Sequence, residues 1–356
     1  MDYTHYLCSM SCEITEFQVN GLVIGFFWLN DEFYKALKAH SLGRFLVYLS
    51  KFECPSMLNT SIIICTYNRE AYLPKCLEHL KAQDADPETF EIVIVNNNSS
   101  DGTNAICTAF RDNNPSLNIT YVIERNPGLS AARNCGIAHA KGEILCFIDD
   151  DGFAVPSYVS IIQHYSQHSD FNSYISFGGK VIPCYNPGKE PKWISSYIDG
   201  VVSKVDLGEQ VKDFDRKYPA GCNMIFRKTF FEQYGGFNAD LHTRGDDKFV
   251  FDKLKKAGLT TLYIPELEVE HFIDDYRLEK SFIVRLSKII GQSEQIRLMN
   301  ASFSQKSIKF LEYVFKLVAA CILALGFVFS GKIEQAKYIL LVRWYVLIGF
   351  FIQSKI

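Results

Sequence analysis

The chain has 356 residues, with 37 lysines and arginines against 40 aspartates and glutamates, and a formal net charge of −3. This balance gives no overall positive field, so nucleic acid is not expected as a partner. Hydrophobic residues make up 48% of the sequence, which predicts a folded protein with a sizeable core and excludes a disordered chain.

Residues 1–58 contain no repeat and no clear motif, and within them only 31–50 has the pattern of a helix. From residue 59 onward, short apolar runs alternate with polar turns and amphipathic stretches. The apolar runs predict four buried strands: Ser61–Cys65, Glu91–Val95, Thr120–Ile123 and Glu143–Ile148. Helices are predicted between and after them, among them Ser130–Ala140 and Pro156–Tyr165. This alternation indicates βαβ units, and therefore an α/β fold with a mostly parallel central sheet flanked by helices.

The pattern is less regular in the second half of the chain. Tyr174–Ile182 is predicted as one strand, and a loop rich in proline and glycine follows it over 183–193. Tyr218–Arg227 has the pattern of a turn followed by a strand, Lys248–Ala257 that of a helix, and Leu262–Ile264 that of a short strand. We expect these elements to extend the sheet and to supply another wall of the same pocket.

A polar cluster directly follows each of the four strands of the first half. These clusters are Thr66–Asn68, Asn96–Asn98, Asn126–Gly128 and Asp149–Asp151. The carboxyl ends of parallel strands lie along one edge of an open α/β sheet, and ligands bind in the crevice there. The sequence therefore predicts that the four clusters converge.

Three consecutive carboxylates, Asp149–Asp151, end the apolar run of the fourth strand. Like charges repel one another and are costly to remove from water, so they need a reason to stand at the end of a buried strand. An acidic loop is one interpretation. The other is a site for a hard divalent cation, Mg²⁺ or Mn²⁺, which prefers oxygen ligands and commonly bridges a carboxylate and a diphosphate. The residues alone leave both open.

Other polar residues have equally open roles. Ser130 could cap the helix that follows Asn126–Gly128, and Arg133, one turn further on, could contact a phosphate or pair with a surface carboxylate. Asp246-Asp247 could be a helix cap or a general base with its neighbour. His271 is an ordinary histidine unless it shares a pocket with the aspartates, where it could bind the same ion. There is no GxGxxG after the first strand and no GxxxxGK[ST], so neither a dinucleotide fold nor a P-loop is indicated.

Eight motifs in order resemble glycosyltransferase family 2, whose members have the GT-A fold. They are SIIICTYNR, IVNNNSSDGT, NPGLSAARN, FIDDD, YPAGCNMIFR, GGFN, GDD and VEH. The resemblance covers Ser61 to His271 and continues into Ser281–Ser293, which is similar to a helical segment after the catalytic domain of many members. It implies a GT-A type nucleotide-binding fold and an inverting, metal-dependent transfer of a sugar. The donor would be a nucleotide-diphospho-sugar.

The resemblance also implies roles for residues that match the family's motifs. The residues implied for nucleotide-sugar binding are Thr66, Tyr67 and Asn68 for base and ribose, Arg133 and Asn134 for base and phosphate, and Asp149 and Asp150 for ribose and donor sugar. Asn96 stands where members often carry an aspartate that accepts from a pyrimidine ring N–H. An amide oxygen can also accept, so uracil or thymine stays possible and the base stays open.

The same resemblance assigns the metal and the catalytic base. Asp151, as the last carboxylate of a DxD-like motif, would bind Mn²⁺ or Mg²⁺ together with His271. Asp247 would be the inverting base, with Asp246 in the acidic position before it. The alternative function is a non-catalytic subunit that binds sugar nucleotides. A sugar nucleotidyltransferase ranks third, because 65–69 lacks the glycine-rich turn of such enzymes.

The C-terminal part differs in composition from the rest. Leu317–Gly331 has no charged residue and Tyr338–Ile352 has only Arg343, but both are shorter than the roughly 20 residues that a spanning helix needs. Eight lysines and arginines stand against three glutamates over 277–316. This pattern favours a hairpin that lies on, or re-enters, an anionic membrane surface over buried core helices or an oligomer interface.

These observations together predict the organisation and location of the chain. We expect an N-terminal extension (1–58), a GT-A catalytic domain (59–275), a basic helical segment (276–309) and a hydrophobic, membrane-associating hairpin (310–356). The 11 cysteines form no CxxC pair and no zinc-like cluster, which favours free thiols and the cytoplasmic face of the membrane. A membrane location suggests a saccharide or lipid-linked acceptor, as in surface polysaccharide or glycoconjugate synthesis. Two short helices are too few for a polymer channel, which favours single additions.

Overall fold

The computed structural model describes residues 14–19, 22–27, 58–186, 190–215, 217–239, 245–299 and 301–352. The chain forms two compact units, Met1–Ser56 and Met57–Ile356. In the first unit, β1 (Ile14–Val19) and β2 (Leu22–Phe27) form an antiparallel hairpin that the sequence pattern did not predict. The helix predicted over 31–50 lies outside the described residues.

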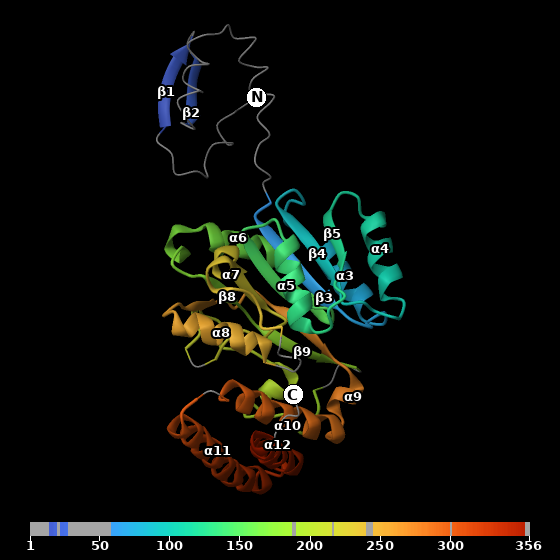
Figure 1. The fold of residues 1–356 in the computed structure, drawn as a ribbon, viewed down its shortest axis with the longest axis vertical. Coiled ribbons are helices and arrows are strands. Elements are labelled where there is room, and N and C mark those ends of the chain that lie inside the picture. Colours follow the sequence, from blue (N-terminus) through green and yellow to red (C-terminus); the bar gives the residue numbers. More distant parts are fainter. Residues whose placement is uncertain are drawn as a thin grey trace. The chain divides into compact units, whose positions relative to one another are not determined.

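The second unit is built around a sheet of eight strands in the order β10-β12-β8-β11-β6-β3-β4-β5 (Figure 1). The strands are β3 (Thr60–Thr66), β4 (Phe90–Asn96), β5 (Asn118–Ile123), β6 (Ile144–Asp149), β8 (Ser176–Gly178), β10 (Lys212–Asp213), β11 (Met224–Arg227) and β12 (Thr261–Tyr263). The four strands predicted for the first half are confirmed, and they pair in parallel. Strand β11 runs antiparallel to both of its neighbours, β6 and β8.

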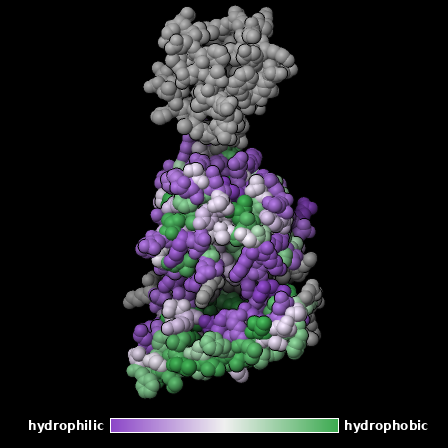
Figure 2. Space-filling model, turned by 90° about the vertical axis from the view of Figure 1, so that its left-hand side faces the viewer, coloured by the Kyte–Doolittle hydropathy of each residue, from purple (hydrophilic) through white to green (hydrophobic). Residues whose placement is uncertain are grey.

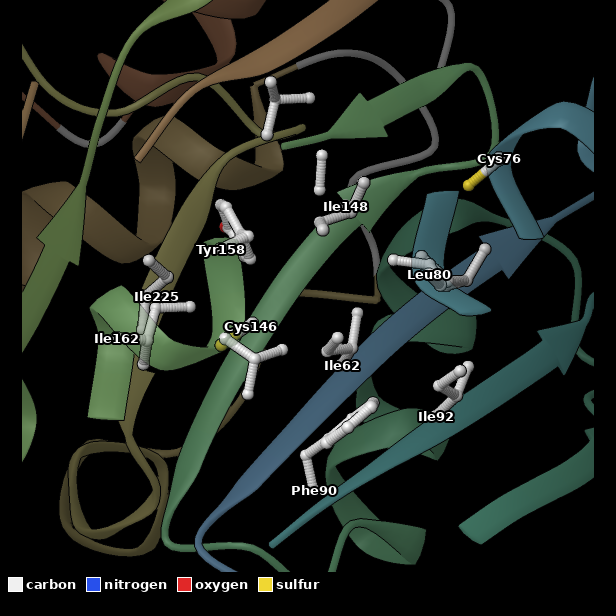
Figure 3. Close-up of a cluster of buried hydrophobic side chains, with 14 of the residues drawn as sticks. Ile62, Cys76, Leu80, Phe90, Ile92, Cys146, Ile148, Tyr158, Ile162 and Ile225 are labelled. Atoms are coloured by element: carbon white, nitrogen blue, oxygen red, sulfur yellow. The ribbon is translucent and has the colours of Figure 1, made fainter. Parts of the chain in front are cut away.

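Helices cover both faces of this sheet, because side chains of each strand point alternately to opposite sides. Ile62 and Ile64 of β3 join one hydrophobic cluster, part of which Figure 3 shows with Leu80 and Ile92, whereas Ile63 joins the other. The helices are α3 (Leu73–Lys81), α4 (Thr103–Asn113), α5 (Leu129–His139), α6 (Tyr158–Gln167), α7 (Lys228–Tyr234) and α8 (Asp246–Lys256). Burial on both faces explains why β3 and β4 have continuous apolar runs instead of alternating ones.

A second, three-stranded sheet stands beside the carboxyl end of β6. It consists of β7 (Gly152–Ala154), β13 (Val269–Ile273) and β9 (Val181–Tyr185), in that order. The single strand predicted over Tyr174–Ile182 is therefore wrong, because β8 belongs to the large sheet and β9 to the small one. The chain changes sheets at Gly179, where an added Cβ would stand 1.9 Å from the carbonyl oxygen of Leu267.

Four helices end the described chain: α9 (Asp275–Leu278), α10 (Lys280–Arg297), α11 (Phe303–Phe329) and α12 (Ile333–Phe351). The expectation that both apolar stretches are too short to cross a membrane is wrong for α11, which has 27 residues. Ser302 begins this helix with a capping box to Gln305, so the helix includes the basic turns before Leu317. The border predicted at residue 310 falls inside α11.

The C-terminal helices pack closely on one another and on the part of the chain that precedes them. An added Cβ on Gly349 of α12 would stand 2.1 Å from the carbonyl oxygen of Lys288 in α10, so the two backbones are in direct contact. Trp193 stacks on Tyr338 of α12, with ring centroids 4.7 Å apart. By length and composition, α11 is the one helix of the described part that could cross a membrane, and 17% of its most apolar window is buried.

Candidate functional site

The predicted polar clusters meet around two adjoining cavities of about 320 and 470 Å³. The smaller cavity is lined by Cys65, Tyr67, Arg69, Leu129, Arg133, Asp149, Asp150, Asp151, Ser203, Gly221, Cys222, Gly245, Asp246, Asp247, His271 and Arg277. The larger is lined by Cys65, Thr66, Tyr67, Asn97, Asn98, Arg125, Pro127, Gly128, Leu129 and Ala132. Each of the four predicted clusters contributes to these walls, because the carboxyl ends of β3, β4, β5 and β6 share one edge of the sheet.

The three consecutive aspartates have different partners. Asp149 ends β6 and is partly exposed, with its Oδ1 3.2 Å from a guanidinium nitrogen of Arg133. Asp150 is buried and pairs with Arg69 at 3.1 Å. Asp151 is buried and lies 2.6 Å from Arg69 and 3.2 Å from Arg277. The repulsion expected for three adjacent carboxylates is therefore compensated by arginines from three separate segments.

Burial and charge act differently on the two buried carboxyls. Burial raises the pKa of Asp150 to about 7, and the positive charge of Arg69 opposes that effect only in part. Burial alone would also raise the pKa of Asp151, but contact with His271 and the charges of Arg277 and Arg69 hold it well below its usual range. Asp151 is accordingly the carboxylate that stays ionised at neutral pH.

His271 lies beside Asp151 because β13 pairs with β7 and sets His271 opposite Gly152. Its Nε2 is 3.1 Å from Asp151 Oδ1, as the predicted metal pair requires. Among the described residues, neither ring nitrogen of this buried histidine has a partner of hydrogen-bond geometry. Ligand atoms of Asp149, Cys222 and His271 also lie within 4.8 Å of one another. Carboxylate oxygens beside an unpaired imidazole fit a divalent cation.

The second acidic pair begins α8 on the opposite wall. Gly245 precedes it with a φ of +111°, a backbone conformation that favours glycine. Asp246 is buried and accepts a 2.5 Å hydrogen bond from Arg133. Burial and the charge of Asp246 raise the pKa of Asp247 to about 6, against the opposing effect of Arg133. Asp247 thus lines the cavity as a carboxylate of increased basicity.

Arg133 connects the two acidic clusters. Its side chain is 3% exposed, and it donates to Asp246, Asp149 and the carbonyl of Gly221. The open alternative of a surface ion pair is therefore wrong. Ser130 does not cap the helix as expected, because α5 already begins at Leu129; its buried hydroxyl has no hydrogen-bond partner among the described residues.

The larger cavity combines exposed aromatic surface with backbone turns. Tyr67 is 59% exposed at its mouth, and the buried hydroxyl of Thr66 in its wall has no hydrogen-bond partner in the part of the chain that the structure describes. The side chain of Asn97 fixes the opposite wall, where it accepts from the N–H of Gly128 and donates to the carbonyl of Asn126. The result is a cleft with a mostly apolar lining, an aromatic side chain at its mouth and amide groups in one wall.

Three predicted site residues do not line either cavity. The amide of Asn96 donates to the hydroxyl of Tyr121 and accepts from the N–H of Ser99. The amide of Asn134 pairs in both directions with the backbone of Phe237. Asn68, with a φ of +52°, accepts from the N–H of Ser100. Their assignment to nucleotide binding stays a prediction, and their observed contacts hold the surrounding turns.

Three arginines that line the two cavities were not assigned from the sequence: Arg69, Arg125 and Arg277. Arg69 directly follows the predicted cluster Thr66–Asn68, so its place after the first strand was a usable signal. Arg277 lies at the start of the basic C-terminal segment, and nothing in its local sequence indicates contact with Asp151. Cys222, also unassigned, lies in a turn that the sequence pattern showed only as the approach to a strand.

Known proteins share this fold and these motifs. Residues 61–235 match the family described as Glycosyl transferase family 2. A glucosyl-dolichyl phosphate glucuronosyltransferase from Haloferax volcanii is 24% identical over 262 residues, which cover 70% of this chain and 80% of that relative. Glycosyltransferase GlyA from Streptococcus pneumoniae is 25% identical over 254 residues, and the chain spans 34% of its length.

The solved structures give the fold. The mannosyltransferase PcManGT from Pyrobaculum calidifontis, solved with GDP-Man and Mn²⁺, superimposes with a TM-score of 0.52. The superposition covers 86% of this chain and 96% of that chain at 17% sequence identity. The predicted GT-A architecture is thereby confirmed.

Proposed function

Because this chain is a glycosyltransferase of family 2, we propose that it catalyses an inverting, metal-dependent transfer of a sugar from a nucleotide-diphospho-sugar to a hydroxyl group of a saccharide or lipid-linked acceptor. The observation that carries this proposal is the meeting of two acidic clusters in one cavity. Asp149–Asp151 end β6 on one wall, Asp246 and Asp247 begin α8 on the other, and Arg133 connects them. One cluster suits the donor and its counter-ion, and the other suits the acceptor.

Asp151 and His271 would hold the ion, with Asp149 and Cys222 within reach of it. Mn²⁺ or Mg²⁺ supplies neutralisation of the charge that develops on the departing diphosphate. The pairing of GDP-Man with Mn²⁺ in the PcManGT structure supports this choice of ion. The larger cavity, with Tyr67 and Thr66 in its walls, would take the nucleoside.

The chain's own side chains carry the proton transfer. Asp247 accepts the proton of the acceptor hydroxyl while that oxygen attacks the anomeric carbon on the face opposite the diphosphate. A single displacement inverts that carbon. The increased pKa of Asp247 favours this role, because a base whose pKa is close to the working pH binds the proton more strongly than an ordinary aspartate does. Asp246, which pairs with Arg133, precedes it in the chain.

The test is Asp247→Asn in the full chain, assayed for sugar transfer and for donor binding. We expect kcat to fall by about 10²- to 10⁴-fold, the usual contribution of a general base, with donor affinity retained. Asp252→Asn, at a partly exposed position of the same helix, is the matched control and should keep its kcat. Near wild-type transfer by a folded Asp247→Asn protein would show that the base is elsewhere. Donor binding without any transfer by the wild type would favour the non-catalytic alternative.

We also propose that the C-terminal part attaches the enzyme to the cytoplasmic face of a membrane. Figure 2 shows hydrophobic residues gathered along the end of the molecule that α11 and α12 form. The exposed apolar side chains of α11 include Ile308, Leu311, Phe315, Val318, Ile322, Leu325 and Phe329. The dolichyl phosphate substrate named for the Haloferax relative supports a lipid-linked acceptor, which would reach the site from such a surface.

A further inference from the structure

The proposed metal ligand Asp151 already has protein partners on both of its carboxylate oxygens. Its Oδ2 lies 2.6 Å from Arg69 and 3.2 Å from Arg277, and its Oδ1 lies 3.1 Å from His271. The side chain is 2% exposed, so water does not share these oxygens to any extent. A divalent ion that binds Asp151 must therefore either displace a guanidinium or stand beside it against like-charge repulsion.

The two arginines differ in what else holds them. Arg69 pairs with Asp150, Asp151 and Asp274. It therefore keeps two carboxylate partners when Asp151 binds a metal ion instead. The only carboxylate that Arg277 pairs with among the described residues is Asp151, and its other contact is a 3.3 Å hydrogen bond to the carbonyl of Phe272. Arg277 is thus the cation that loses its anion when a metal arrives.

Arg277 is also placed to find a new anion. It lines the smaller cavity together with Asp151 and His271, where the donor's diphosphate would meet the ion. It belongs to α9, a single helical turn between the small sheet and α10, and its side chain is 14% exposed. A guanidinium binds phosphate oxygens in the same forked geometry as it binds carboxylate oxygens.

We propose that Arg277 occupies the metal-binding carboxylate of Asp151 in the donor-free enzyme and transfers to the donor's diphosphate when metal and donor bind. This inference rests on the metal dependence of the proposed function. A metal alone leaves Arg277 without an anionic partner, whereas metal and diphosphate together give it one. The two ligands therefore bind with positive cooperativity, and by linkage each increases the affinity of the other by the same factor.

The experiment is calorimetric titration of the full chain with Mn²⁺ alone, with inorganic pyrophosphate alone, and with each in the presence of the other. Pyrophosphate is the probe because the base of the donor is open. In the wild type we expect Mn²⁺ to bind at least tenfold more tightly when pyrophosphate is present. In Arg277→Gln we expect Mn²⁺ alone to bind at least fivefold more tightly, and pyrophosphate with Mn²⁺ at least tenfold more weakly.

Two further variants complete the design. Arg285→Gln, an exposed arginine of α10 whose guanidinium lies over Phe282, is the matched control and should reproduce the wild type. Arg277→Lys keeps the positive charge but loses the forked pair of N–H donors. Its cooperativity between Mn²⁺ and pyrophosphate should lie between that of the wild type and that of Arg277→Gln. If Arg277→Gln melts at a lower temperature than the wild type, Arg277→Lys serves as the test variant.

The opposite changes in Mn²⁺ and pyrophosphate affinity separate this proposal from simpler ones. If Arg277→Gln weakens pyrophosphate binding but leaves the affinity for Mn²⁺ alone unchanged, Arg277 only binds the anion and its competition with the metal is refuted. If both affinities match the wild type, Arg277 has no role at the site. If the wild type binds Mn²⁺ in neither condition, the metal dependence of the proposed function itself fails.

Discussion

The pKa values of single side chains in the site are set by burial and by neighbouring charges more than by residue type. Asp150, Asp151 and Asp247 are all aspartates, yet burial raises the pKa of the first to about 7 and that of the third to about 6. Asp151, also buried, is held ionised by His271, Arg277 and Arg69. Such a separation of pKa values within one pocket is typical of sites that divide acid, base and ligand roles between carboxyl groups.

The pKa of Asp247 predicts a pH dependence of the transfer reaction. A general base must be ionised, so kcat/KM of the free enzyme should decline tenfold per pH unit below about pH 6 and level off above it. Rates between pH 5 and pH 8 at saturating metal give the profile. The residual activity of Asp247→Asn should not show this decline of kcat/KM below about pH 6. An acidic limb with a midpoint near 4 in the wild type would mean that Asp247 behaves as an ordinary carboxyl.

At the scale of elements, a buried glutamate joins three helices, among them the one that begins with Asp246 and Asp247. Glu294 of α10 is 3% exposed and pairs with Lys248 of α8, Arg297 of its own helix and Lys309 of α11. Lys248 directly follows Asp247, so this cluster connects the helix of the proposed base to the apolar helix at the C-terminus. The packing of α10 against α12 through Gly291 and Gly349 fixes the rest of the assembly.

The cluster predicts a strong effect of removing the central charge. Glu294→Gln leaves three cations around a neutral side chain, and loss of one partner of a buried ion pair costs about 3 to 5 kcal/mol of unfolding free energy. Chemical denaturation measures this loss. Glu312→Gln, which removes the exposed partner of Lys309 and Lys316, is the control and should cost about 1 kcal/mol or less. Equal losses in both variants would contradict the central role of Glu294.

The same cluster gives a pH dependence of stability. Burial alone would raise the pKa of Glu294, but hydrogen bonds from Arg297 and Lys248 and the charge of Lys309 lower it to about 2. Because the pKa is lower in the folded state, the stabilisation is present above the ordinary glutamate pKa near 4.3 and is lost as the pH falls from there toward 2. Unfolding free energies of the wild type and Glu294→Gln should therefore approach each other below about pH 4 and converge near pH 2.

At the scale of the whole molecule, the exposed face of α11 predicts partition to membranes. Seven of the exposed apolar side chains from Ile308 to Phe329 recur at intervals of three and four, which keeps these seven on one side of the helix. Core helices of soluble proteins pass the same length and composition test but are mostly buried, whereas α11 is 17% buried over its most apolar window. This face adjoins basic turns that suit anionic lipid headgroups.

A triple variant, Phe315→Ser, Ile322→Ser and Leu325→Ser, tests this attachment without touching the packed face of α11. Each side chain is more than half exposed, so folding should be little affected while sedimentation with anionic lipid vesicles is lost. Ile123→Ser, an exposed apolar position on β5, is the control and should sediment like the wild type. A wild type that stays in the supernatant, or a triple variant that still sediments, would refute the membrane proposal.

Much of the fold follows from local sequence, and for local reasons. The four parallel strands and their polar ends could be predicted because apolar runs of strand length and turn residues are adjacent in the chain. The same local signal failed at Tyr174–Ile182, where close contact with Leu267 divides one apolar run between two sheets. The local signal also gave the wrong helix length at α11, because amphipathic turns before Leu317 extend the helix beyond the apolar stretch.

The sequence by itself determined the family, the order of the motifs and which types of residue could carry the chemistry. Only the tertiary structure decided which charges meet. Arg69 and Asp151 are 82 residues apart, Arg277 and Asp151 126, and Arg133 and Asp246 113. A pairing between distant residues depends on how strands and helices are stacked, and its effect on a pKa depends on burial that no local pattern records. For that reason the sequence could nominate Asp151 as a metal ligand, whereas the arginine that competes for it emerged only from the folded chain.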